Sequence, residues 1–161
     1  ISSERTFSQD VDDDEELGRR LIQQSGSVAG TMRQSSFRAK TITVKLRDHD
    51  FKTRQHSRTV PEPIESDHAI CRVAKELLAQ LRKNRRVPAR LLGVGLSGLV
   101  PSQDASQLGL FAEPIAGETD RERTVSRTVD ELRDRFGREA VMPGRLVKPE
   151  RATRTPGDGR E

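Results

Sequence analysis

Two neighbouring stretches of the chain alternate two kinds of residue with a period of two. Apolar residues alternate with Thr, Lys and Arg from position 41 to 47, and a second alternation runs from 51 to 60. The residues between them, Asp-His-Asp at 48–50, favour a turn. A period of two places successive side chains on opposite faces of a strand. The sequence therefore predicts a β-hairpin over 37–60.

The flanking segments predict two helices and two more strands. Residues 66–83 carry apolar side chains at the i, i+3, i+4 and i+7 spacing of an amphipathic helix. An earlier helix, opened by an acidic run, is expected to be broken or frayed at Gly26 and Gly30. Residues 1–10 and 90–100 have the pattern of strands.

These elements follow the order β-α-β-β-α-β. We expect an α+β fold in which a four-stranded antiparallel or mixed sheet carries both helices on one face. The other face of the sheet is then free to meet a partner. The residues expected between the two layers are Ile42, Val44, Leu46, Leu77, Leu81 and Leu92.

The chain divides into four parts. Residues 1–101 form the predicted domain, and 102–111 form a polar linker that ends in a short apolar peptide. Residues 112–140 form an extended or helical tail, in which spaced apolar residues predict an amphipathic helix. Residues 141–161 are rich in Pro, Gly and Arg and are expected to be disordered. The apolar stripe of the tail helix consists of Val125, Val129, Leu132 and Phe136.

Composition limits both the core and the class of protein. The chain is 34% charged and 32% hydrophobic and has neither Trp nor Tyr, so we expect part of it to lie outside a packed core. All of the +4 net charge lies in 1–111, where there are 18 Lys or Arg and 14 Asp or Glu. A single Cys excludes an internal disulfide. No apolar run reaches membrane length and no signal peptide is visible, so no membrane partner is expected. The start without Met indicates a fragment or a processed chain.

The predicted hairpin is basic, with eight Lys or Arg and only two Asp over 33–58. Four basic side chains alternate along 52–58, so they share one face of their strand. If this face continues that of the preceding strand, the sheet exposes a row of cations that suits a nucleic-acid backbone. A solvated face without a partner is the alternative. Small residues at 93 and 95 are expected to let a partner's backbone approach. The predicted nucleic-acid-binding residues are Thr43, Lys45, Arg47, Lys52, Arg54, His56, Arg58, Gly93 and Gly95.

The peptide Gln-Leu-Gly-Leu-Phe at 107–111 places three large apolar residues after a polar linker. Such a peptide either docks on another protein or folds back onto its own domain. In the docking interpretation, Leu108, Leu110 and Phe111 enter an apolar pocket, and the amide of Gln107 fixes the orientation through hydrogen bonds.

No catalytic or metal-binding group of residues is evident. The three His and the one Cys match no zinc signature, and there is no phosphate-binding glycine loop or nucleophile motif. The acidic run at 12–16 offers carboxylates for a metal, but acidic residues also favour a helix N-terminus, which is the preferred interpretation. We therefore expect no catalytic residue, no metal site and no cofactor in this chain.

Several segments together resemble the little-finger domain of Y-family DNA polymerases of the DNA polymerase IV type. They are the hairpin, the helix at 66–83, the strand that begins Arg-Leu-Leu-Gly-Val-Gly at 90, and the Ser-Glu-Arg-Thr-Phe at 3–7. The resemblance covers about residues 1–111. It implies a β-α-β-β-α-β unit whose sheet face lies along the major groove and grips the template and primer backbones. It also implies that 107–111 binds the sliding clamp.

The resemblance further implies a function, an oligomeric state and a cellular location. The chain would be a non-catalytic, DNA-binding part of an error-prone translesion polymerase, monomeric and located in a bacterial cytoplasm. The parent protein would be a DNA-directed DNA polymerase that uses Mg²⁺. Two other functions stay open, an RNA-binding α/β module and a protein-interaction adaptor. An RNA-binding sheet stacks bases on aromatic residues, whereas here Phe37 and Phe51 lie only at strand ends.

Overall fold

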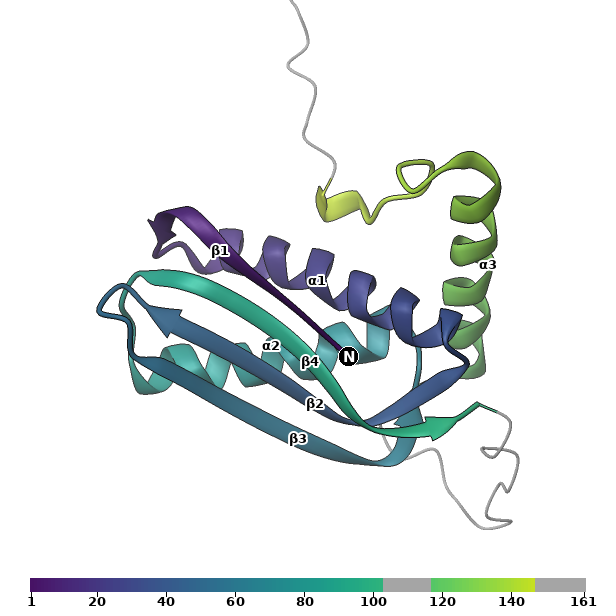
Figure 1. The fold of residues 1–161 in the computed structure, drawn as a ribbon, viewed down its shortest axis with the longest axis horizontal. Coiled ribbons are helices and arrows are strands. Elements are labelled where there is room, and N and C mark those ends of the chain that lie inside the picture. The colour runs from purple at the N-terminus through teal and green to yellow at the C-terminus, as the bar shows by residue number, and fades with distance from the viewer. Residues whose placement is uncertain (103–116, 147–161) are drawn as a thin grey trace, which may run out of the picture.

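A computed structural model describes residues 1–102 and 117–146. The predicted order β-α-β-β-α-β is confirmed, and a third helix follows it (Figure 1). The strands form one sheet in the order β1-β4-β2-β3, with every neighbouring pair antiparallel. The elements are β1 (Ser2–Val11), α1 (Asp14–Gln34), β2 (Phe37–Asp48), β3 (Thr53–Ile64), α2 (Asp67–Asn84), β4 (Ala89–Pro101), α3 (Asp120–Phe136) and the short 3-10 turn η2 (Gly144–Leu146).

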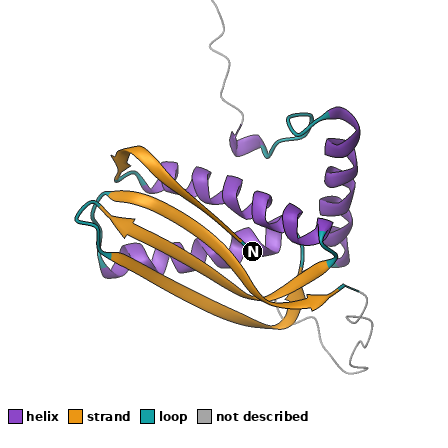
Figure 2. Ribbon diagram, viewed as in Figure 1, coloured by secondary structure: helices purple, strands orange, loops and turns teal. Residues whose placement is uncertain are grey.

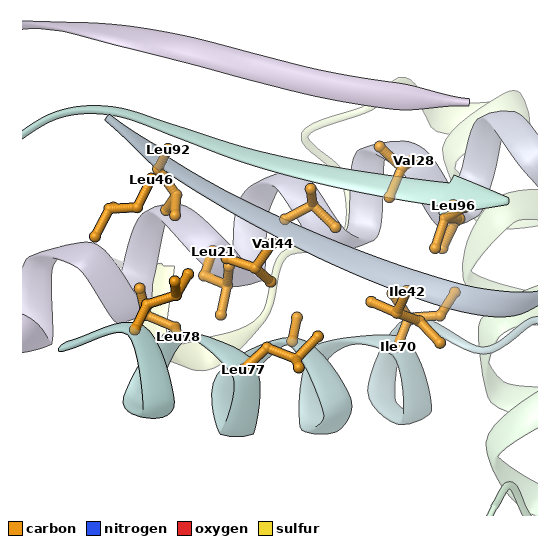
Figure 3. Packing of buried hydrophobic residues seen from close by; sticks show 14 of the residues in the cluster. Leu21, Val28, Ile42, Val44, Leu46, Ile70, Leu77, Leu78, Leu92 and Leu96 are labelled. Atoms are coloured by element: carbon orange, nitrogen blue, oxygen red, sulfur yellow. The ribbon is translucent and has the colours of Figure 1, made fainter. Parts of the chain in front are cut away.

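The sheet and the first two helices form two layers. Both α1 and α2 cover the same face of the sheet, as predicted, and leave the opposite face uncovered by helices (Figure 2). From position 42 onward, the even-numbered residues of β2, such as Ile42 and Val44, are fully buried between the layers, as the alternation over 41–47 predicts. Figure 3 shows Leu77 of α2 and Leu92 of β4 in the same cluster. The six residues expected between the layers are all part of the core.

The first helix is continuous, so the prediction that it breaks at Gly26 and Gly30 is wrong. A glycine costs about 1 kcal/mol in a helix interior, but the buried side chains on both sides of these positions offset that cost. The absence of a side chain at Gly26 lets α1 pass close to the start of α2. A Cβ at Gly26 would lie 3.3 Å from the Oδ2 atom of Asp67. The glycine therefore marks a close helix contact rather than a break.

The tail helix α3 is present where the stripe predicts a helix, but it faces the domain with its polar side. Asp130 accepts a bidentate hydrogen bond from Arg33 at 2.7 and 3.0 Å, and Ser126 accepts one from the backbone N–H of Asp67 at 3.2 Å. Most of the stripe points away from the domain, since Val125 is 54% exposed and Phe136 is 71% exposed, whereas Val129 is half-buried. None of the helices in the described parts of the chain is long and apolar enough to cross a membrane.

Acid is expected to loosen the contact between α3 and the domain. Burial raises the pKa of Glu122, but the hydrogen bonds that this carboxylate accepts outweigh burial and lower the pKa to about 2. The donors are the Thr119 backbone N–H, Arg72 and His68. A lowered pKa stabilises the docked helix fully above pH 4.5, the ordinary pKa of Glu, and this stabilisation is lost as the pH falls toward 2. NMR shifts of α3, followed from pH 6 down to about 2, should report this release.

The matched variant is Glu122→Gln, which cannot titrate. We expect it to weaken the docking of α3 at neutral pH and to remove the part of the acid transition that Glu122 causes. An identical transition in the variant would show that other groups control the release.

Candidate nucleic-acid interface

The uncovered side of the sheet, called here the outer face, carries the odd-numbered residues at the centre of β2. Lys45 lies opposite Gly93 of β4 on one side and Gln55 of β3 on the other. Arg47 lies opposite Thr53. The outer-face residues used below are Ser2 and Glu4 of β1, Thr41, Thr43, Lys45 and Arg47 of β2, Thr53, Gln55, Ser57 and Thr59 of β3, and Gly93, Gly95 and Ser97 of β4.

Hydroxyl groups pair across β2 and β3 on this face. Thr43 Oγ1 lies 2.8 Å from Ser57 Oγ, and the same kind of pair joins Thr41 and Thr59 at 2.9 Å. Arg47 Nε donates to the hydroxyl of Thr53 at 3.0 Å. Each hydroxyl can both donate and accept, so these pairs keep further capacity for a ligand. The centre of the face is therefore a low surface of hydroxyl and glycine positions with two cations.

Lys45 is paired with an acid from the edge strand. Its Nζ atom lies 3.0 and 3.2 Å from the two carboxylate oxygens of Glu4. The Glu4 side chain reaches Lys45 by passing over Gly93, where a Cβ would lie only 2.8 Å from Glu4 Cγ. The glycine at 93 is thus needed by the protein itself. Gly95 differs, because a Cβ there would meet its neighbours at 3.8 and 3.9 Å, which is ordinary contact.

The predicted single row of cations is wrong, because the two strands of the hairpin carry their basic residues on opposite sides of the sheet. From Thr41 to Arg47, odd-numbered residues of β2 pair with odd-numbered residues of β3. The two cations of this stretch of β2, Lys45 and Arg47, are odd-numbered, whereas the basic residues of β3 are even-numbered. Arg54, His56 and Arg58 therefore lie opposite the buried residues of β2, on the side of the helices.

The contacts of these three side chains agree with this placement. Arg58 pairs with Glu76 of α2, and His56 Nδ1 lies 3.3 Å from Gln80 Oε1 of the same helix. Arg54 binds deeper. Its Nη2 lies 2.7 Å from Asp48 Oδ1, and its Nη1 donates to the Leu81 carbonyl at 2.5 Å. The three side chains thus tie β3 to α2.

A buried carboxylate lies at the centre of this attachment. Asp48 is fully buried and receives both Arg54 and Arg85, the latter at 2.5 Å. Arg85 also bonds Asp50 in the turn and thereby lowers the pKa of that carboxyl. Lys52 is exposed at the turn, 3.5 Å from Asp50. Of the nine predicted residues, five lie on the outer face, three on the helix side and Lys52 at the hairpin tip.

Sequence reasoning missed Glu4, Ser57 and, apart from Thr43, the other hydroxyl residues of the outer face. Ser57 and Thr59 alternate with the arginines of β3, so the pattern placed them on one face together but did not say which. The predicted peptide 107–111 lies outside the described residues. Within 1–102 and 117–146, no group of three His, Cys, Asp or Glu could hold a metal ion.

Comparison with known proteins places this arrangement in a family. Residues 1–110 match the family described as "impB/mucB/samB family C-terminal domain". The DNA polymerase IV of Caulobacter vibrioides is 35% identical over 148 residues, which cover 92% of this chain and 35% of that polymerase. The chain thus spans about a third of the length of the curated relatives it matches.

Solved structures share the fold. A chimera of the Y-family DNA polymerases Dbh and Dpo4 has a TM-score of 0.56 at 19% identity, covering 62% of this chain and 28% of the chimera. The little finger domain of PolIV, solved in complex with the beta-clamp processivity factor, has a TM-score of 0.51 at 18% identity. That match covers 70% of this chain and 98% of the domain. This chain belongs to the impB/mucB/samB family, and its residues 1–110 form that family's C-terminal domain, with the fold of the little finger domain of PolIV.

Proposed function

We propose that this chain is the DNA-gripping, non-catalytic part of an error-prone translesion DNA polymerase, and that its outer face binds the backbone of primer-template DNA. The observation that carries the proposal is the outer face itself, where Lys45 and Arg47 lie among hydroxyls and glycines on a sheet face that none of the described helices covers. Cations, hydroxyls and backbone N–H groups are the usual donors to phosphate oxygens. Such contacts fix position on a duplex without reading its sequence.

The RNA-binding alternative has less support. None of the outer-face residues named above is aromatic, so that face offers no ring on which an unpaired base could stack. Phe51 is exposed, but it lies in the hairpin turn beneath the guanidinium of Arg90, 4.6 Å from the ring centre.

Catalysis is assigned to another part of the polymerase. Two-metal phosphoryl transfer needs carboxylates that hold metal ions. Residues 1–102 and 117–146 include no cluster of three such groups, so we propose that the Mg²⁺ ions of the reaction are bound outside these residues. A monomeric state and a bacterial cytoplasmic location complete the proposal.

Salt dependence tests the proposed interface. Lys45, Arg47 and Lys52 offer two to three phosphate contacts, so the logarithm of the affinity for duplex DNA should fall with the logarithm of salt concentration at a slope of about −2 to −3. Arg47→Ala should weaken binding about equally for all sequences and make the slope shallower by about 1. Arg58→Ala removes the same charge on the helix side and should leave the affinity nearly unchanged. Fluorescence anisotropy with labelled primer-template measures both variants.

The two arginine variants distinguish DNA binding at the outer face from DNA binding at the β3 edge. If Arg58→Ala weakened binding as much as Arg47→Ala, DNA would contact the β3 edge and not the outer face. A slope near zero, or a strong preference for one sequence, would contradict backbone binding altogether.

We also propose that the peptide at 107–111 docks on a sliding clamp. The support is its sequence together with the little finger domain of PolIV, which was solved in complex with a beta clamp. The domain holds the chain on both sides of this segment. Ser102 N donates to the Ser36 carbonyl at 2.9 Å, and Arg72 donates to the Gly117 carbonyl at 2.5 Å.

The double variant Leu110→Ala with Phe111→Ala should abolish clamp binding, because it removes the largest apolar groups that a pocket would receive. Wild-type affinity should be on the order of micromolar, as suits a short peptide that is ordered on docking. Surface plasmon resonance on an immobilised clamp measures both proteins. Asp104→Ala, in the linker, is the control and should bind normally. Retained clamp binding in the double variant would refute the assignment, and a lowered melting temperature would indicate a peptide folded back onto the domain.

A further inference from the structure

A carboxylate lies among the phosphate-binding groups of the outer face. Glu4 is 41% exposed on the edge strand β1, and its carboxylate contacts the ammonium of Lys45 through both oxygens. This acid works against the proposed ligand, since it would repel a phosphate brought to Lys45. The other acids near this end of the sheet are occupied elsewhere, Asp10 by Arg90 and Asp48 by two arginines.

The position of Glu4 is built into the sheet. Glu4, Gly93 and Lys45 lie in one row across β1, β4 and β2. Only a residue without a Cβ at position 93 leaves room for the Glu4 side chain to cross β4. A glycine in a strand interior has no side chain to pack and weakens the strand. An exposed ion pair adds little to folding stability, so stability alone does not account for this arrangement.

We propose that Glu4 limits the affinity of the outer face for DNA by holding Lys45 in the free domain and releasing it only when a phosphate replaces the carboxylate. This inference rests on the proposed function of the outer face. Both carboxylate oxygens of Glu4 already accept hydrogen bonds from the ammonium group of Lys45, which is one compact charge, so a phosphate brought to Lys45 competes with Glu4 for it. A phosphate that binds Lys45 must displace Glu4, and the nearby negative charge of Glu4 still repels it. The acid therefore keeps the grip on DNA weak and easily broken.

The variant Glu4→Gln tests the inference, because it keeps the size of the side chain and removes the charge. For the full 161-residue chain, anisotropy with labelled primer-template DNA should show an affinity about 3- to 10-fold higher at low salt. The slope of log affinity against log salt should become steeper by about 0.9, the value of one additional phosphate contact. Glu131→Gln makes the same change in net charge on α3 and should leave both quantities nearly unchanged.

A double-mutant cycle with Lys45→Gln then locates the effect. If Glu4 acts by occupying Lys45, the gain from Glu4→Gln should shrink markedly when Lys45 is already replaced. Equal gains in both backgrounds, or no gain in either, would overturn the inference while leaving DNA binding by the wild type intact. An equal gain from Glu131→Gln would also overturn it, since net charge alone would then account for the effect. Absence of salt-dependent DNA binding in the wild type would refute the proposed function and this inference with it.

Discussion

Arg54→Ala is expected to lower the free energy of unfolding by about 3 kcal/mol, because it strips one of two guanidinium partners from a carboxylate that water cannot reach. Asp48 is fully buried, and Arg54 contacts it through two nitrogens at 2.7 and 3.0 Å. The same side chain also donates to the carbonyls of Leu81 and Arg85 at the end of α2. Arg85 still neutralises part of the Asp48 charge in the variant, which keeps the loss toward the low end of the range for broken buried pairs.

Urea denaturation followed by far-UV circular dichroism measures this loss. Arg47→Ala is the matched control, because it removes an arginine from the preceding strand. Among the side chains of the described residues, Arg47 hydrogen-bonds only the hydroxyl of Thr53. Its effect on stability should stay within about 0.5 kcal/mol, as for an ordinary surface position. When DNA affinity is measured instead, Arg47→Ala should show the larger loss and Arg54→Ala the smaller one. Similar stability losses in both would mean that the ion pairs of Asp48 do not hold β3 to α2.

Leu77→Ala should cost about 2–5 kcal/mol of unfolding free energy, by lost burial and by the cavity that the smaller side chain leaves. Leu77 is 2% exposed and lies on the inner side of α2, within the cluster that joins both helices to the sheet (Figure 3). Leu77→Met nearly conserves volume and should cost less than about 1.5 kcal/mol. Thermal denaturation of the two variants against wild type gives the comparison. A loss below about 1 kcal/mol for the alanine variant would contradict tight packing at this position.

Periodicity made the layers of this fold predictable. The even-numbered apolar residues of β2 and the i, i+3, i+4 pattern of α2 identify side chains that must be buried, and those side chains are in the core. The order of the elements then leaves few ways to cover one face of a four-stranded sheet with two helices. The candidate site was predictable to the extent that it depends on β2 and β4, whose inward-facing apolar residues fix which residues point outward.

The face of β3 was not predictable in the same way. Its sequence alternates basic residues with Ser, Thr and Gln, so neither set is apolar and the pattern does not tell which set is buried. On the helix side, Asp48 and Glu76 receive Arg54 and Arg58, and these contacts stabilise the observed orientation. The orientation of α3 could not be predicted either. Ion pairs such as that between Arg33 and Asp130 hold the polar side of α3 against the domain, whereas most of its apolar stripe is exposed.

The length of the hairpin turn restricts which insertions and deletions related proteins can accept there. Four residues, 49–52, separate β2 from β3, and this count sets odd against odd across the hairpin. An insertion or deletion of a single residue in the turn would rotate β3 by one position and exchange its two faces. Asp48 would lose Arg54 and keep only Arg85, and the hydroxyls of Ser57 and Thr59 would turn toward α2. We therefore expect related polymerases to vary this turn in steps of two residues, or to compensate with a bulge in β3.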